Sequence, residues 1–215
     1  LGSTTNISPV CAYDFNNNHA NTMGSSSFDL VATININVVY GDPTTNQKSV
    51  SGLAGGSSLL EHPANYIFTT HNTISFIHRP IQLVSHSVIN FKRADGQDTF
   101  IIAGVVQGAN FNYLLFLTNP NGGGAQTFLF SNPNNDTFVN NDNAIVLYNI
   151  DNDYFWYING AFHGLISVSW SPLQAIEPSK LYLDLNNTLD ANGILYDLKF
   201  YNQPLFEYPA STSEQ

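Results

Sequence analysis

The chain has 215 residues, of which 43% are hydrophobic and only 10% are charged, and its formal net charge is −10. This balance excludes a disordered tail and a charge-rich helical protein, and the negative charge disfavours nucleic acid as a partner. The single cysteine excludes an internal disulfide framework. No run of about 18 apolar residues occurs, so the sequence does not predict insertion into a membrane.

The predicted strands begin with the stretch 28–40, where Ile34, Ile36 and Val38 alternate with polar residues as in a half-buried strand. Short runs rich in Ile, Val, Phe and Tyr follow, separated by clusters of Asn, Asp, Gly and Pro. These further predicted strands are 73–78, 87–92, 99–106, 112–117, 144–150, 153–158, 181–185 and 194–201. Asn159-Gly160 is a strong signal for a tight hairpin after 153–158.

Helical periodicity is weak along the whole chain, because Gly, Pro or Asn interrupts every candidate apolar stripe. The composition does not shift along the sequence, and no Pro-rich linker divides it. We therefore predict an all-β protein with one antiparallel two-sheet sandwich over 1–206 and a C-terminal tail over 207–215.

Five segments spread over nearly the whole chain form an ordered set of motifs. They are AYDFNNN at 12–18, SGLAGGSSL at 51–59, NTISF at 72–76, WYING at 156–160 and YDLKFYNQPL at 196–205. In this order they resemble the motifs of the laminin-G-like, concanavalin A-like lectin/glucanase superfamily. The resemblance implies a jelly-roll sandwich that either binds or hydrolyses carbohydrate, and it allows calcium without placing it.

Sugar hydrolysis requires two carboxylates about 5–9.5 Å apart across the scissile bond. The glucanases of the superfamily carry them in a Glu-x-Asp-x-Glu strand, which this sequence lacks. No acidic residue lies two positions from Glu61 or Glu177, and no Gly-x-Ser-x-Gly nucleophile motif occurs. We therefore predict a non-enzymatic module with no catalytic residues, and a glycoside hydrolase or lyase is the alternative.

The strand 153–158 is aromatic or apolar on both faces, which a strand with one solvated face would not be. One pair, either Tyr154 with Trp156 or Phe155 with Tyr157, is expected to pack in the core, and the other pair can form an aromatic platform for a sugar. The predicted ligand-binding residues are Tyr154, Trp156, Tyr157 and Asn159. The structural alternative is that long loops cover the second face of the sheet.

Calcium is the one cofactor that the sequence suggests, because the loops are rich in carboxylate and amide oxygens. Asp151 and Asp153 are the candidate ligands, and a solvated turn is the alternative role for both. The predicted function is lectin-like recognition or adhesion outside the cytosol, at a cell or virion surface, with a glycan or glycoprotein as partner. The receptor-binding head of a viral or phage spike is the second prediction, and the oligomeric state is left without a prediction.

Overall fold

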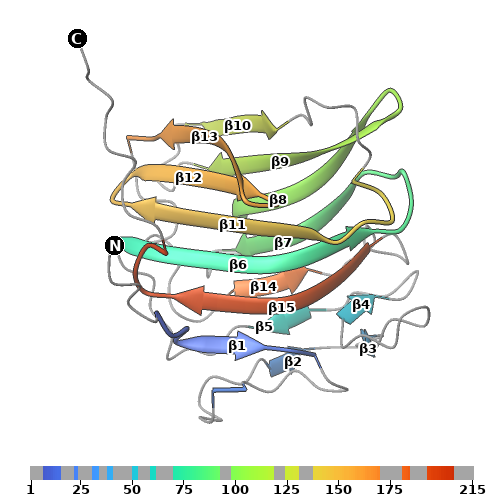
Figure 1. The fold of residues 1–215 in the computed structure, drawn as a ribbon, viewed down its shortest axis with the longest axis horizontal. Helices are drawn as coiled ribbons and strands as arrows, with labels where there is room; N and C mark the ends of the chain where they lie inside the picture. Colours follow the sequence, from blue (N-terminus) through green and yellow to red (C-terminus); the bar gives the residue numbers. More distant parts are fainter. Residues whose placement is uncertain are drawn as a thin grey trace.

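The computed structural model describes residues 7–15, 22–23, 31–33, 38–40, 50–52, 59–61, 70–92, 98–118, 124–130, 138–169, 181–184 and 193–205. These residues form two antiparallel sheets, A and B (Figure 1). Sheet A has the order β13 (Ala161–Ser167), β12 (Asp153–Ile158), β11 (Asn143–Ile150), β6 (His71–Pro80), β15 (Gly193–Tyr201), β4 (Val50–Gly52) and β3 (Val38–Tyr40), and β1 (Cys11–Tyr13) also pairs with β15. Sheet B has the order β10 (Ala125–Phe130), β9 (Asn110–Thr118), β8 (Asp98–Gln107), β7 (His86–Lys92), β14 (Leu181–Asp184), β5 (Leu59–Glu61) and β2 (Val31–Thr33).

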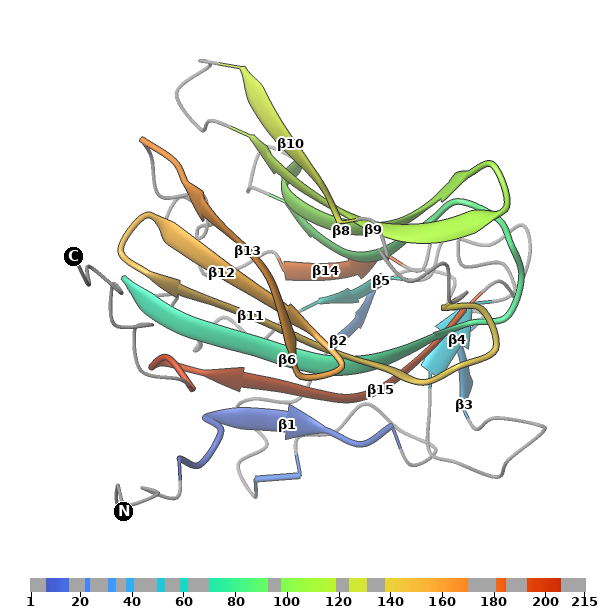
Figure 2. The ribbon, with the colours of Figure 1, turned by 45° about the horizontal axis from the view of Figure 1, so that its top comes forward.

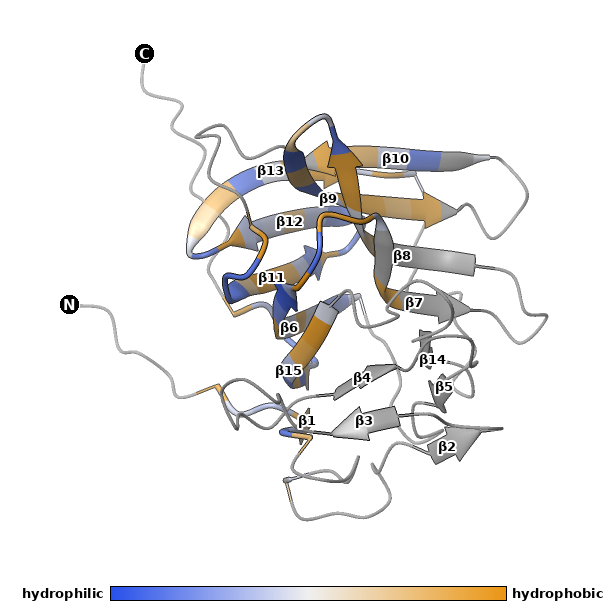
Figure 3. Ribbon diagram, turned by 90° about the vertical axis from the view of Figure 1, so that its right-hand side faces the viewer, coloured by the Kyte–Doolittle hydropathy of each residue, from blue (hydrophilic) through white to orange (hydrophobic). Residues whose placement is uncertain are grey.

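The hydrophobic core lies between the two sheets, which face each other in Figure 2. Side chains of both sheets point into this space, and Figure 3 shows hydrophobic residues on β9 of sheet B and on β15 of sheet A. The inward side chains of β9 are fully buried, and they are Phe111, Tyr113, Leu115 and Leu117. Burial of one such side chain stabilises the fold by about 1.5–3 kcal/mol, so the core holds the two sheets together.

The structure confirms the all-β, antiparallel prediction. The predicted strands from 73–78 to 194–201 are all present, within about two residues at each end. Strand β10 lies in a segment for which the sequence predicted no strand. In the described part of the chain, no helix has the length and hydropathy that spanning a membrane requires.

The prediction of a single strand over 28–40 is wrong. Its described residues form two short strands in different sheets: β2 pairs with β5 in sheet B, and β3 pairs with β4 in sheet A. Period-2 alternation shows that one face of a strand is buried, and a strand in either sheet of a sandwich buries one face against the core. The pattern therefore could not show that the chain changes sheets within this stretch.

The two ends of the described chain meet in sheet A. Strand β1 pairs with β15, and Cys11 lies opposite Phe200 while Tyr13 lies opposite Leu198. Strand β15 also pairs with β6 along most of its length. The last strand of the chain is therefore an interior strand of its sheet.

Candidate functional site

The two faces of β12 have different surroundings in the structure. Tyr154 and Trp156 belong to the core cluster between the sheets and are 1% and 0% exposed. Because a fully buried side chain has no surface to offer a ligand, the structure gives no support for the predicted ligand-binding role of these two residues. The other predicted arrangement, with Phe155 and Tyr157 on the outer face of sheet A, is the one that the structure adopts.

Three pairs of outward-facing residues cross from β12 to the edge strand β13, and we call them the outer ladder. They are Asp153 with Ser167, Phe155 with Leu165, and Tyr157 with Phe162. The outer ladder thus has a polar end, a middle in which Leu165 is exposed while Phe155 is 1% exposed and only supports it, and an aromatic end.

The outer ladder has two exposed apolar side chains, both on the edge strand β13. Phe162 is 51% exposed and Leu165 is 46% exposed. The rings of Tyr157 and Phe162 lie 5.2 Å apart between centroids, at an interplanar angle of 52°. Exposed aromatic surface beside a half-buried tyrosine is suited to contact with an apolar face of a ligand.

A stack of buried rings supports the outer ladder from the side of β11. Tyr148 stacks on Phe155 with centroids 4.7 Å apart and on Tyr157 with centroids 6.0 Å apart. Tyr148 lies opposite Thr73 of β6, whose hydroxyl donates to the carbonyl of Gln203 at 2.7 Å. The segment after β15 therefore lies against the outer face beside Thr73, next to the stack.

The polar end of the outer ladder is held by a hydrogen bond. The Ser167 hydroxyl donates to Asp153 Oδ1 at 2.5 Å. Asp151 lies in the turn before β12 with a φ of 52°, and its N–H donates to the carbonyl of Thr70 at 2.8 Å. Across the described ranges, no three side chains of His, Cys, Asp or Glu gather where they could hold a metal ion. A calcium site at Asp151 and Asp153 remains a prediction for which those ranges supply no third acidic ligand.

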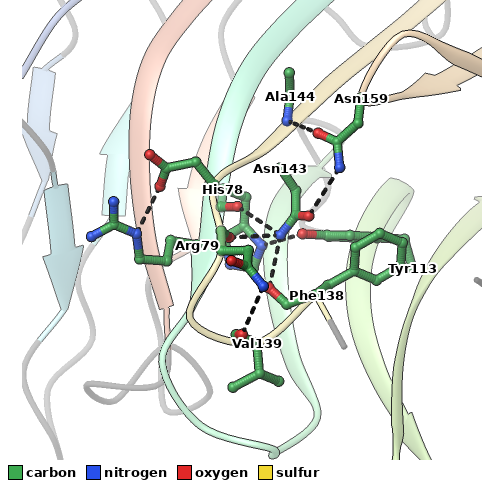
Figure 4. Close-up of polar contacts among 10 residues, drawn as sticks. His78, Arg79, Tyr113, Phe138, Val139, Asn143, Ala144 and Asn159 are labelled. Atoms are coloured by element: carbon green, nitrogen blue, oxygen red, sulfur yellow. Dashed lines mark hydrogen bonds and ion pairs between the residues drawn. The ribbon is translucent and has the colours of Figure 1, made fainter. Parts of the chain in front are cut away.

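Asn159 forms the tight hairpin between β12 and β13 together with Gly160. Both residues have a positive φ, 51° and 78°, as in a type I′ turn, and the predicted tight hairpin is present. The side-chain oxygen of Asn159 accepts from the N–H of Ala144 at 2.8 Å, and its Nδ2 donates to Asn143 Oδ1 at 3.3 Å (Figure 4). The amide of this predicted ligand-binding residue thus ties the hairpin to β11.

A closed polar cluster lies under this hairpin, between the sheets. His78 Nδ1 and the Tyr113 hydroxyl lie 2.9 Å apart, and both side chains are fully buried. Asn143 Nδ2 donates to three carbonyls, those of His78, Phe138 and Asn141, at 3.3, 3.0 and 2.9 Å. Burial raises the pKa of Tyr113 well above its usual value, and its hydrogen bond with Asn143 opposes this rise. Because the cluster is closed to solvent, its role is to join the sheets.

Two further features flank these residues. Arg79 Nε donates to Asp142 Oδ1 at 2.7 Å, and the guanidinium lies 5.5 Å from the ring centroid of Tyr196. On β13, the register passes from Gly164 to Phe162 between Trp156 and Tyr157, so His163 forms a β-bulge. Burial lowers the pKa of His163.

Phe162 and Leu165 did not stand out in the sequence. The available signal was the segment 161–167, AFHGLIS, which contains no charged residue and follows the predicted hairpin. An edge strand is usually protected by charges, and their absence marks an edge that is suited to contact with another molecule. Which of its residues face outward depends on the bulge at His163, and the sequence does not specify that bulge.

No protein-family model and no curated protein matches the sequence. Among solved structures, the chain is similar to the binding domain of botulinum neurotoxin DC in complex with rat synaptotagmin II (TM-score 0.64, 16% identity, 93% of this chain and 49% of that chain). It is also similar to the binding domain of Paraclostridial Mosquitocidal Protein 1 (TM-score 0.64, 16% identity, 92% and 49%). A third similar structure comes from botulinum neurotoxin type C, whose cell entry is described as dependent on interaction with two ganglioside molecules (TM-score 0.67, 17% identity, 93% and 49%).

These similarities concern the fold alone, because the identities are low. The chain spans about half the length of each of these three chains. The shared feature is a β-rich architecture that occurs in binding domains.

Proposed function

We propose that this chain is a non-catalytic recognition module that binds a glycan or glycoprotein at a cell surface, and that the outer ladder is its contact surface. The observation that carries the proposal is the half-exposed Phe162, which packs against Tyr157 on an edge strand without charged residues. Aromatic rings of this kind cover the apolar face of a sugar, while polar neighbours bond its hydroxyls. Asp153 and Ser167 supply such polar groups at the other end of the ladder.

The similar solved structures support this proposal. Two come from botulinum neurotoxins and one from a mosquitocidal protein, two are named as binding domains, and gangliosides are mentioned for one and synaptotagmin II for another. We accordingly infer a place of action outside the cytosol, at a cell or virion surface. We also infer that the two sheets form a jelly roll of the concanavalin A-like kind, in keeping with the five ordered motifs.

The positions of three described carboxylates support binding rather than catalysis. Asp142 is paired with Arg79, Asp153 accepts from Ser167, and Asp197 lies 2.6 Å from Lys199 Nζ. A glycoside hydrolase or lyase would instead place two carboxylates on either side of a bound sugar.

A protein receptor is the second candidate partner, as for the head of a viral or phage spike. The edge strand β13 favours it, because exposed apolar side chains on a sheet edge also suit contact with a protein segment. Binding of a protein receptor with no binding of glycans would favour this candidate.

A glycan array with and without EDTA tests the proposal. We expect the intact chain to bind at least one glycan class, and we expect Phe162→Ala to weaken that binding about 3- to 10-fold, since an aromatic contact contributes about 0.5–1.5 kcal/mol. Loss of binding in EDTA alone would assign calcium a role.

Leu83→Ala is the matched control for this experiment. Leu83 is 43% exposed in the loop between β6 and β7, outside the outer ladder. Its truncation is expected to leave glycan binding unchanged. Equal losses in the two variants, or no glycan binding with or without EDTA, would contradict the proposal.

A further inference from the structure

Within the described segment that contains the outer ladder, all residues with a formal charge at pH 7 are acidic. The segment 138–169, which contains β11, β12 and β13, has no Lys or Arg. Asp153 forms the polar end of the ladder, and Asp151 lies in the turn directly before it. A ligand seated on the ladder therefore has a carboxylate as its nearest charged neighbour within this segment.

The cations whose side chains the structure describes, Arg79 and Lys199, are engaged elsewhere. Arg79 pairs with Asp142 and lies over Tyr196. Lys199 pairs with Asp197 on β15, which is three strands away from β12. Three strand spacings are about 14 Å, which exceeds the Debye length of about 8 Å at physiological ionic strength.

The histidine of β13 does not supply a cation at neutral pH either. His163 lies next to Phe162 in the bulge, and burial moves its pKa downward from 6.5. Burial therefore disfavours the cationic form of its imidazole.

The outer ladder has the form of an extended site. Its three pairs run from Asp153 to Tyr157, a distance of about 13 Å along the strand. An oligosaccharide laid along it would stack one sugar on Tyr157 and Phe162, pass Leu165, and meet Asp153 and Ser167 with its hydroxyls. A hydroxyl can donate to the carboxylate, whereas a second carboxylate cannot.

We propose that the outer ladder binds a neutral oligosaccharide, without carboxylate, sulfate or phosphate groups, and this proposal rests on the proposed function above. An anionic sugar would leave water without gaining a cationic partner from the ladder, and it would lie near Asp153. We expect a neutral glycan to bind at least about fivefold more tightly than its anionic counterpart.

The test uses galactose-terminated oligosaccharides, each paired with its terminally sialylated counterpart, on the intact chain in a buffer of low ionic strength. The neutral member of each bound pair is expected to bind more tightly, and the preference is expected to shrink as salt is added. Asp153→Asn keeps an acceptor for Ser167 while removing the charge, so it is expected to reduce the preference about twofold or more.

Asp197→Asn is the control, because it changes the net charge by the same amount on a distant strand. If it reduces the preference as much as Asp153→Asn does, the preference arises from the overall charge and the assignment to the outer ladder is overturned. Tighter binding of the sialylated glycans would overturn the neutral-ligand proposal and leave the recognition function standing. Binding of neither class would overturn both.

Discussion

Gly104 of β8 shows how closely a ring of the neighbouring strand β9 packs over the backbone of sheet B. A Cβ atom at this position would lie 1.9 Å from Cζ of Phe111. The Phe111 ring is fully buried, with its centroid 5.6 Å from that of Tyr113 and 6.3 Å from that of His78. The sequence did not indicate this position, because the requirement for glycine comes from a ring on the neighbouring strand.

Gly104→Ala is expected to lower the free energy of unfolding by about 1–3 kcal/mol, since the added methyl group overpacks a closed site. Urea denaturation followed by tryptophan fluorescence measures the loss. Phe111→Leu provides the control background, because a shorter side chain makes room for the methyl group. An equal cost of Gly104→Ala in both backgrounds would show that the ring is not the cause.

Cys11 is the residue with the clearest expected dependence on pH. Its side chain is fully buried and forms no disulfide. Burial raises the pKa of its thiol from 9.0 to about 12, and a hydrogen bond with Tyr13 opposes this rise. Above pH 9 the unfolded chain releases the thiol proton while the folded chain retains it. The free energy of unfolding therefore falls as pH rises.

Between pH 9 and 12 we expect this thiol to reduce the free energy of unfolding by up to about 1.4 kcal/mol per pH unit. Cys11→Ala should remove that slope, although the cavity lowers the stability at pH 8. Denaturant unfolding at several pH values compares the two proteins. Because Tyr113 also releases its proton late, the difference between the slopes is the informative quantity, and parallel slopes would argue against the buried thiol.

The hairpin of β12 and β13 is the element that presents the outer ladder. Asn159→Gly keeps the positive φ and removes both side-chain hydrogen bonds, so it should cost about 1 kcal/mol. Asn159→Ala should cost about 1 kcal/mol more, because alanine is strained at this φ. Thermal or urea unfolding of the two variants separates the backbone requirement from the hydrogen bonds.

Glycan binding by the Asn159→Gly variant tests the predicted role of Asn159 as a ligand-binding residue. With the side chain assigned to the hairpin, the affinity should match that of the unmodified chain. A loss of affinity as large as that caused by Phe162→Ala would instead show that the Asn159 side chain takes part in ligand binding.

The sequence predicted the element that carries the site but only part of the site itself. The aromatic run in β12 and the Asn159-Gly160 turn were visible as local patterns. The sequence did not show which face of β12 lies in the core, because Tyr154 and Trp156 are as apolar as Phe155 and Tyr157. Tyr148 and Leu165 join the site through strand pairing, which a single segment does not specify.

At the scale of the whole molecule, most strands from 71 onward followed from the sequence, although β10 was not predicted and β13 was expected only as the continuation of a hairpin. The pairing of the strands within the two sheets did not follow from the sequence. The pairing of β1 with β15 joins residues nearly 190 positions apart, and no local pattern specifies contacts at that distance. The resemblance of the terminal segments to family motifs was the one signal for it.

We propose that 1–206 is one folding unit and that 207–215 is a dispensable tail. A chain that ends at Asn192 lacks β15 and the buried side chains of Leu195, Leu198 and Phe200. It is expected to show no cooperative unfolding transition by near-ultraviolet circular dichroism.

A chain that ends at Phe206 is the matched control, and it should unfold as the complete chain does. Cooperative unfolding of the chain that ends at Asn192 would show that sheet A does not require its last strand.

The interior position of β15 also has a consequence for synthesis on the ribosome. About 120 residues separate the end of β6 from the end of β15, and at about 5–20 residues per second their translation takes roughly 6–25 s. During that interval β6 and β1 both lack β15, the strand with which each of them pairs in the folded protein. A nascent chain of this protein is therefore expected to depend on chaperones that cover exposed strands until the last strand has left the ribosome.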